Sequence, residues 1–482
     1  MSDLTVLAVD LGAESGRITA VKFDGRSLDL EEVTRFPNRP VQVHGRLHWN
    51  VLGLWEEITA GLQAAQRLHP ASIGVDAWGV DYALLDSKGE LVGLPVHYRD
   101  ARTDGIPDKV FEKVPRREVF RKTGIQIMQI NTLYQLFSMV EERSPQLEIA
   151  DTLLTIPALF HYWMTGTKAC EYTNATTTQM LNAGSGTWAV ELLERLEIPT
   201  HILPNVVEPG TRLGEYEGVP VIAPASHDTG SAVVAVPATA DHFAYISSGT
   251  WSLAGLEVSQ PVITDAALEA NLTNEGGVFG TIRLLKNVMG LWIVQQCRDT
   301  WRIEGQEFSY ADLVELARTA KPLQSIIAVN DERFLAHGDH PTRIRTFCEE
   351  TKQAVPKSPG ETIRAVLESL ALAYRDAFEK LEAVSGRSIE VIHIVGGGAD
   401  NQLLDQMTAD ALGKLVLAGP REATVIGNGL VQLIALEELN DLQQARQVLS
   451  EMKVVNRYEP NPSPAWEEAF DRYQQLRGYG HS

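Results

Sequence analysis

The chain has little cysteine, few aromatic residues and a shortage of positive charge. Its 482 residues include 3 Cys and 7% aromatic residues, and 42 Lys and Arg stand against 63 Asp and Glu. Cys170, Cys297 and Cys348 lie too far apart for a disulfide framework or a zinc motif, so we expect small buried residues in a reducing compartment. The net charge of −21 argues against a nucleic-acid groove and against an anionic membrane surface.

Long apolar runs are also missing. The most apolar stretch, 153–164, contains Pro157 and His161 and is too short to span a bilayer. No basic region followed by an apolar run begins the chain, which argues against a signal peptide. We therefore expect a cytoplasmic protein without nucleic-acid or membrane partners, as a monomer or a small homo-oligomer.

Strand-like and helical patterns alternate, which predicts an α/β fold. The apolar runs 4–9, 18–23 and 72–76 have the composition of strands. A helix is predicted over 52–66, where Asn50 can cap it. The stretch 361–383 carries an apolar stripe at helical spacing, which we interpret as a core face.

The same coarse plan, an early turn motif and a later helix, occurs once in each half of the chain. The stretch 236–241 has the composition of a crossover between the halves. We therefore predict two domains, 1–238 and 239–482.

Two glycine-bearing turns lie between strand-like runs, VDLGAESGR at 9–17 and ISSGTWSL at 246–253. Backbone N–H groups of such turns can bind an anion, and two turns suggest a nucleotide held between related domains. Asp10 begins the first turn, where a carboxylate suits a divalent cation, and Gly12 and Gly16 allow phosphate to approach closely. An ordinary hairpin with an Asx turn is the alternative.

A third glycine cluster, 396–398, follows an apolar strand and precedes a helix predicted from Asn401. It lacks the G-x-G-x-x-G spacing of dinucleotide-binding proteins, which argues against a Rossmann dehydrogenase. A flat glycine surface against adenine fits the cluster better.

The catalytic candidate is the segment SHDTG at 226–230, which follows a strand-like run. Phosphoryl transfer needs an aligned hydroxyl and a proton acceptor, and Asp228 at a strand end suits the second task. The alternative is a helix N-cap by Asp228 or Thr229. His227 is equally compatible with a core histidine, and no second His or Cys stands at ligand spacing to support a metal role.

A polar and aromatic set completes the candidates, and sugars are commonly held by such groups in a concave site. Its members are Trp78, Arg99, Arg102 and Asn287.

These motifs occur in the order seen in the FGGY carbohydrate kinases, and the chain resembles that family over nearly its whole length. The runs that carry the resemblance are DAWGVDY (76–82), LPVHYRDART (94–103), NTLYQL (131–136), YTNATTTQ (172–179), ASHDT (225–229), SSGTWSL (247–253), LKNVMGLW (285–292) and IVGGG (394–398). The resemblance implies two ribonuclease H-like domains of the actin and hexokinase type around a central cleft, with ATP and Mg²⁺. Within the family, these runs are similar to kinases that phosphorylate the ketose L-rhamnulose at O1.

By that resemblance Asp228 would be the base that takes the proton from the sugar's O1. The residues implied to hold the ketose are Gly79, His227, Asp228, Thr229 and Asn287. Those implied to hold ATP are Ala13, Glu14, Ser15, Gly16, Arg17, Thr250, Gln295 and Gly397, and Asp10 would position Mg²⁺ through water. Many relatives carry Ser or Thr in place of Glu14, so we expect backbone groups of this turn, rather than the Glu14 carboxylate, to contact phosphate.

Two other hypotheses remain open. The substrate would be another ketose or polyol, such as L-fuculose, L-ribulose, xylulose or glycerol, if a different hydroxyl pattern fits the pocket. A nucleotide-switch protein, chaperone-like or filament-forming, would share the phosphate turns but would not need the sugar set. It should also carry a separate partner-binding domain, and only short helical segments follow residue 440.

Overall fold

The computed structural model describes residues 4–239, 243–452 and 455–477. Its chain divides into two compact units. Unit 1 comprises Met1–Thr239, Glu257–Leu284 and Ala423–Lys453, and unit 2 comprises Ala240–Leu256, Leu285–Glu422 and Val454–Ser482. The predicted domains 1–238 and 239–482 stay a prediction, and residues 240 and 241 of the expected crossover lie outside the described residues.

Unit 1 contains a six-stranded sheet in the order β13-β14-β6-β1-β2-β3. Strand β1 (Leu4–Leu11) pairs antiparallel with β2 (Ser15–Phe23) and parallel with β6 (Ser72–Ala77). Strand β3 (Leu28–Pro37) extends one edge, and β14 (Val219–Ile222) and β13 (Arg212–Tyr216) form the other. All residues of β6 are buried, including the polar Ser72 and Asp76, as is usual for a central strand covered on both faces.

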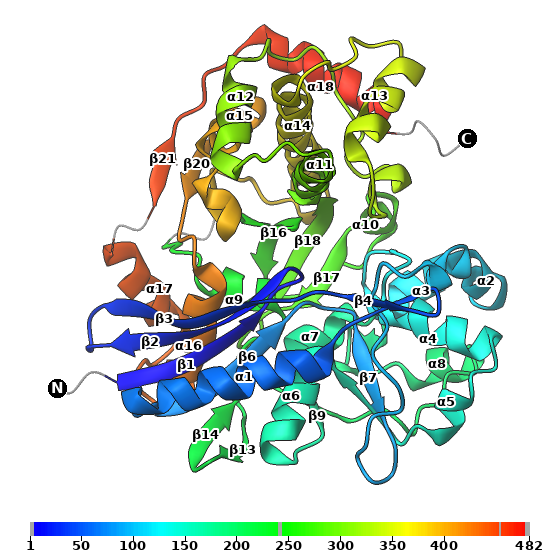
Figure 1. Cartoon of the computed structure of the whole chain (residues 1–482), viewed down its shortest axis with the longest axis vertical. Helices are drawn as coiled ribbons and strands as arrows, with labels where there is room; N and C mark the ends of the chain where they lie inside the picture. The colour runs from blue at the N-terminus through cyan, green and yellow to red at the C-terminus, as the bar shows by residue number, and fades with distance from the viewer. Residues whose placement is uncertain (1–3, 240–242, 453–454, 478–482) are drawn as a thin grey trace. The chain divides into compact units, whose positions relative to one another are not determined.

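Helices cover both faces of this sheet (Figure 1). Helix α1 (Val51–Ala65) begins where Asn50 accepts a hydrogen bond from the Gly53 N–H at 3.1 Å, which confirms the predicted cap. A Cβ at Gly61 would lie 2.6 Å from side-chain atoms of Ile18, so α1 packs closely on the sheet. Helix α16 (Ala423–Ala435) contacts β1, β2 and β6, and Gly429 lies against Val21. Ile18 and Val21 point to opposite sides of β2, so the two helices cover opposite faces.

A second core in unit 1 lies beside the sheet. Strands β7 (Tyr82–Leu85) and β8 (Thr152–Thr155) pair antiparallel, and their buried side chains join those of several helices in one cluster. These helices are α2 (Ile106–Lys113), α3 (Arg116–Thr123), α4 (Thr132–Glu141), α5 (Pro145–Ile149) and α8 (Val190–Arg195). Helix α6 (Ile156–Thr165) contacts both β7 and β6 and so connects this core to the main sheet.

The strands of unit 2 repeat the pattern of unit 1. Strand β15 (Phe243–Ser248) pairs antiparallel with β16 (Trp251–Val258) and parallel with β19 (Val391–Val395). Beyond β19 lie β20 (Leu415–Ala418) and β21 (Asn456–Tyr458), and β18 (Ile282–Met289) lies beside β16. Each unit therefore has a hairpin followed by a parallel partner, as the repeated turn motif suggested, and the predicted α/β fold is confirmed.

Helix α14 (Pro359–Ser385) is central to the helical part of unit 2 (Figure 1). It contacts α11 (Trp292–Ile303), α12 (Tyr310–Thr319), α15 (Gln402–Leu412) and α18 (Pro464–Leu476). The helix begins after Ser358, which accepts a hydrogen bond from the Glu361 N–H, and ends at Gly386 in the left-handed region. The predicted apolar stripe is fully buried, which confirms it as a core face; its members are Ile363, Leu367, Leu370, Tyr374, Phe378 and Leu381.

Two further findings concern the cysteines and the apolar segments. Cys170, Cys297 and Cys348 are free and buried. In the part of the chain that the structure describes, no helix has the length and apolar character needed to cross a membrane.

One buried carboxyl group should destabilise the protein at neutral pH. Asp405 on α15 is fully buried, and neither of its oxygens has a hydrogen-bond partner among residues 4–239, 243–452 and 455–477. Burial, together with the nearby charge of Asp400, raises the pKa of this carboxyl well above its ordinary value. In the unfolded chain it ionises near pH 3.9, so stability is lost as the pH rises above about 3.9 toward the raised folded value.

We therefore expect Asp405→Asn to raise the melting temperature at pH 8 and the gain to shrink toward pH 4. For unfolding of all 482 residues, each kcal/mol gained raises Tm by about 1 °C, which calorimetry resolves. The matched control is Asp410→Asn on the same helix, because Asp410 accepts hydrogen bonds from Gln406 and Asn461 and should not gain stability. A lower Tm for Asp405→Asn at pH 8 would contradict the prediction.

Candidate active site

Two carboxylates lie side by side where β1 and β6 end. Asp10 is the direct register partner of Asp76 in the parallel pair. Asp10 accepts a hydrogen bond from Arg17 Nε at 2.9 Å. Asp76 is fully buried and accepts one from Asn428 Nδ2 at 2.5 Å, while its Oδ1 has no hydrogen-bond partner among the described residues. Burial and then the charge of Asp10 raise the pKa of Asp76 well above its usual range.

The first predicted phosphate turn is the hairpin between β1 and β2. Asn38 holds it, because its N–H donates to Glu14 O and its side-chain amide donates to Gly12 O. The structure adds a packing reason for Gly16, since a Cβ there would overlap the Phe36 ring. Packing on β3 therefore accounts for this glycine, whereas the contacts predicted between ATP and residues 13–17 stay a prediction.

The predicted catalytic segment is held by a buried carboxylate. Glu171 accepts hydrogen bonds from both the N–H and the hydroxyl of Ser226, at 2.8 and 2.7 Å. It accepts two more from Thr173, whose hydroxyl in turn accepts the N–H of His227 at 3.1 Å. Ala77 at the end of β6 donates to Ser226 O at 3.0 Å. Residues 226–228 are thus fixed to the central strand and to α7 (Tyr172–Thr177).

Asp228, the predicted base, lies at the start of a helix and is partly exposed. It is the first residue of α9 (Asp228–Val234), and the N-cap is His227 without a side-chain cap, so the alternative of a helix cap by Asp228 or Thr229 is wrong. Its Oδ1 accepts hydrogen bonds from the N–H and the hydroxyl of Thr229. Burial raises its pKa, His227 opposes the shift, and Asp10 adds to it. The side chain keeps 28% exposure, so a substrate can reach it.

An aromatic wall is built around a second buried carboxylate, Asp81. The indole N–H groups of Trp49 and Trp78 donate to its Oδ2 at 2.5 and 3.0 Å. The backbone N–H of Tyr98 donates to the same oxygen, and Gln135 donates to Oδ1 at 3.0 Å. The rings of Trp49 and Trp78 lie 4.1 Å apart. Burial raises the pKa of Asp81 to about 6, although these hydrogen bonds oppose the shift.

The backbone beside this wall is strained. Gly79 lies against Thr177, whose hydroxyl would be 2.8 Å from a Cβ at that position. Val80 has φ of 65°, a left-handed conformation that is unusual for a β-branched residue. Hydrogen bonds from Val80 N–H to Thr177 and from the Thr132 hydroxyl to Val80 O maintain it. Strain of this kind concentrates at functional sites, which supports the prediction that Gly79 contacts the sugar.

In unit 2 the structure places two of the predicted nucleotide residues, Thr250 and Gln295, in contact. The second turn connects β15 and β16, and Gln295 on α11 donates to the Thr250 hydroxyl at 3.4 Å. Gly398 packs so closely on Ser248, at the end of β15, that a Cβ there would overlap the Ser248 hydroxyl. Gly397 between its neighbours is exposed, with open space where a Cβ would be. The predicted contact of this cluster with adenine stays a prediction.

The predicted ketose residues are divided between the units. Gly79 and residues 227–229 lie in unit 1, and Asn287 lies on β18 in unit 2. Residues that the sequence did not single out for the site are Trp49, Glu171, Gln135 and Asn428. Each acts through a contact distant in sequence, and Trp49 shows no local signal beyond preceding a helix.

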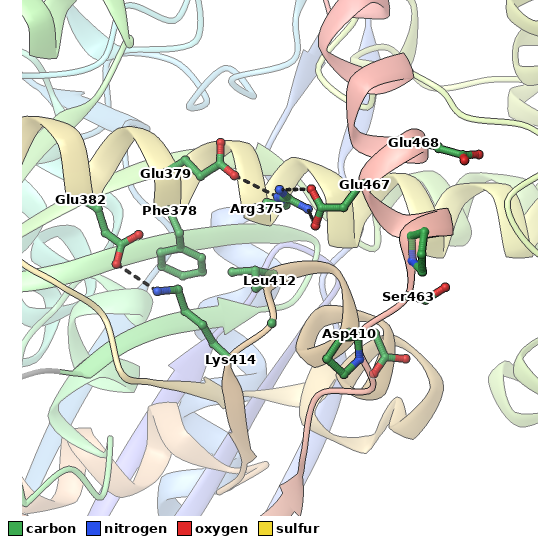
Figure 2. A pocket seen from close by; sticks show the side chains of 13 residues that line it. Arg375, Phe378, Glu379, Glu382, Asp410, Leu412, Lys414, Ser463, Glu467 and Glu468 are labelled. Atoms are coloured by element: carbon green, nitrogen blue, oxygen red, sulfur yellow. Dashed lines mark hydrogen bonds and ion pairs between the residues drawn. The ribbon is translucent and has the colours of Figure 1, made fainter.

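A groove of about 740 Å³ on unit 2 lies apart from all these residues. Figure 2 shows its side chains, which come from α14, α15 and α18 and from the loops beside them. Arg375 is paired with Glu379 and Glu467, and Lys414 with Glu382. None of the predicted site residues lines this groove, and the cations in it are neutralised by neighbouring carboxylates.

Comparison with known proteins finds one family along most of the chain. The model of the FGGY family of carbohydrate kinases, N-terminal domain, matches residues 5–234, and that of the C-terminal domain matches residues 244–436. A rhamnulokinase from Bacteroides thetaiotaomicron is 42% identical, covering 97% of this chain and 98% of its own. A rhamnulokinase from Enterococcus faecalis is 42% identical over 95% and 94% of the two chains.

The fold is also found in a solved structure. A ligand-bound xylulose kinase from Lactobacillus acidophilus superposes with a TM-score of 0.80, covering 98% of each chain at 18% identity. At that identity the likeness shows the fold alone.

Tryptophan emission should report the ionisation of Asp81. Because two indole N–H groups donate to this carboxylate, we expect the fluorescence of the wild type to titrate with an apparent pKa of about 6. Asp81→Asn should lack that step. It should also cost about 1–3 kcal/mol of stability, since the amide sets an N–H against a neighbouring donor. Asp108→Asn, at an exposed position on α2, is the control and should keep the step. A step that persists in Asp81→Asn would refute the assignment.

Proposed function

Because this chain belongs to the FGGY family of carbohydrate kinases, we propose that it transfers the γ-phosphoryl group of ATP to O1 of L-rhamnulose. The products are L-rhamnulose 1-phosphate and ADP, and the reaction belongs to L-rhamnose degradation. Support for the acceptor comes from the curated rhamnulokinases at 42% identity over nearly the whole chain. The observation that carries the chemistry is Asp228, a reachable carboxylate with a raised pKa on a segment held by Glu171.

In the transfer step, a bond forms between the sugar's O1 and the γ-phosphorus while the bond from that phosphorus to the bridging oxygen of ADP breaks. Asp228 accepts the O1 proton during this exchange. Its Oδ1 is occupied by two hydrogen bonds from Thr229, so we assign the proton to Oδ2. The raised pKa lets the carboxyl hold that proton until the product leaves, when the proton returns to solvent.

The residues proposed for ATP fit an anionic ligand. The backbone of residues 13–17, together with Thr250, Gln295 and Gly397, would hold the nucleotide, and Gly397 offers the open surface that a flat base needs. Asp10 and Asp76 supply carboxylate oxygens of the kind that Mg²⁺ prefers, and Asp76 Oδ1 has no partner among the described residues. Mg²⁺ would neutralise phosphate charge. No group of three or more His, Cys, Asp or Glu side chains in the described ranges could hold a metal, so phosphate oxygens would complete its coordination.

The sugar would lie against unit 1. Gly79, residues 227–229 and the indole of Trp78 are the groups proposed to orient it, with Asn287 from unit 2. A site that hydrogen-bonds each hydroxyl discriminates strongly between epimers, because a missing partner leaves a buried polar group unpaired.

Replacing the proposed base should separate catalysis from binding. We expect Asp228→Asn to reduce kcat by about 10²–10⁴, because the amide cannot accept the O1 proton, while the Kd for ATP changes little. A coupled assay of ADP release gives kcat, and calorimetry gives the Kd. Asp151→Asn, at a half-exposed carboxylate of unit 1, is the control and should keep wild-type activity. Equal losses of turnover and ATP binding would show that Asp228 is structural.

The acceptor is tested by ADP release with Mg·ATP and a panel of ketoses and polyols. We expect the highest kcat/KM with L-rhamnulose. A higher value with L-fuculose, L-ribulose, xylulose or glycerol would keep the reaction and replace the substrate. Release that no sugar stimulates would contradict the kinase and favour a nucleotide switch.

A further inference from the structure

A buried arginine, Arg283, contacts His227, the residue that precedes the proposed base Asp228. Arg283 on β18 is fully buried, and its Nη2 lies 3.0 Å from His227 Nδ1. Its Nε donates to Gly276 O at 2.8 Å, which fixes the plane of the guanidinium. Glu275, itself nearly buried, lies 3.3 Å from the same Nη2 and balances the charge. All these residues belong to unit 1.

The contact decides where His227 carries its proton. A guanidinium nitrogen is a permanent donor, so the ring nitrogen 3.0 Å from it must present a lone pair. A proton on Nδ1 would set two N–H groups against each other at that distance. The Arg283 contact therefore favours a lone pair on Nδ1, while Glu275 Oε2, 3.4 Å from the same nitrogen, is the competing partner. The shorter of the two contacts at Nδ1, that with Arg283, assigns the ring proton to Nε2.

That Nε2 faces the proposed base. It lies 3.4 Å from Asp228 Oδ1, the same oxygen that accepts two hydrogen bonds from Thr229. An N–H there attracts the carboxylate oxygen, whereas a lone pair would repel it. Three donors then turn toward Oδ1 and leave Oδ2 for the substrate.

We propose that Arg283 is a positioning residue that holds His227 in its neutral Nε2–H tautomer, so that this N–H orients the carboxylate of Asp228. The part that concerns catalysis rests on the proposed function of Asp228, while the tautomer itself does not. Glu275 is needed because an uncompensated buried guanidinium would be costly. The arrangement resembles other sites in which the partner of one histidine nitrogen determines what the other nitrogen does.

The tautomer can be measured without any substrate. In ¹⁵N-histidine-labelled protein at pH 7.5, we expect His227 to show a pyridine-type Nδ1 and a pyrrole-type Nε2. The signals are assigned by their loss in His227→Gln. In Arg283→Met, Nδ1 loses its donor and keeps Glu275 Oε2, an acceptor 3.4 Å away, so it should become protonated. A protonated Nδ1 in the wild type would overturn the proposal, and this holds even if Arg283→Met fails to fold.

A matched pair of variants tests the catalytic consequence. The amide nitrogen of Gln can replace Nε2, whereas that of Asn replaces Nδ1. We expect His227→Gln to retain kcat within about tenfold and His227→Asn to lose about 10–100-fold more, with similar Kd for ATP. Equal kcat for the two variants, or a higher kcat for Asn, would refute the orienting role. Absence of turnover with every sugar would instead contradict the proposed function and leave the tautomer result standing.

Discussion

Buried carboxylates in unit 1 need hydrogen-bond donors, and this need determines where the segments around the proposed site lie. Glu171 takes four hydrogen bonds from Thr173 and Ser226 and thereby fixes the segment that carries Asp228. Asp81 does the same for the aromatic wall, where three of its four donors come from Trp49, Trp78 and Tyr98. An unsatisfied buried carboxylate costs several kcal/mol, so these hydrogen bonds favour one placement of each segment. The same requirement therefore determines both where the segment with Asp228 lies and which charged groups surround it.

Glycine supplies the second constraint, since several close approaches leave no room for a side chain. Gly427 on α16 lies against the backbone of Ser231 on α9. A Cβ added at Gly74 on β6 would lie 2.7 Å from the side-chain oxygen of Asn428. Through these contacts α16 comes near enough for Asn428 to reach Asp76. In unit 2, Gly398 packs on Ser248 in the same way. Close packing thus brings polar groups to the strand ends, where ligands of such folds bind.

The charge distribution around Asp228 follows from the same burial. A base that must hold a proton only during transfer needs a pKa above that of a free carboxyl, and burial provides the rise. A positively charged His227 would limit that rise, whereas the tautomer proposed for it carries no charge and acts on the carboxylate only through its Nε2–H. Arg283 and Glu275 lie on the Nδ1 side of the His227 ring, where their opposite charges balance each other.

Local sequence alone determined the hairpins, the central strands, the stripe on α14 and the segment that bears Asp228, because periodicity, caps and glycine turns act between near neighbours. The family followed from ordered motifs over the whole chain. Tertiary structure decided the rest. The bond from Asn428 to Asp76 joins residues 352 positions apart, and Trp49 meets Asp81 across 32. Only folding showed that Gly16 accommodates Phe36 and that Arg283 lies behind His227, since such pairings depend on packing that no local pattern encodes.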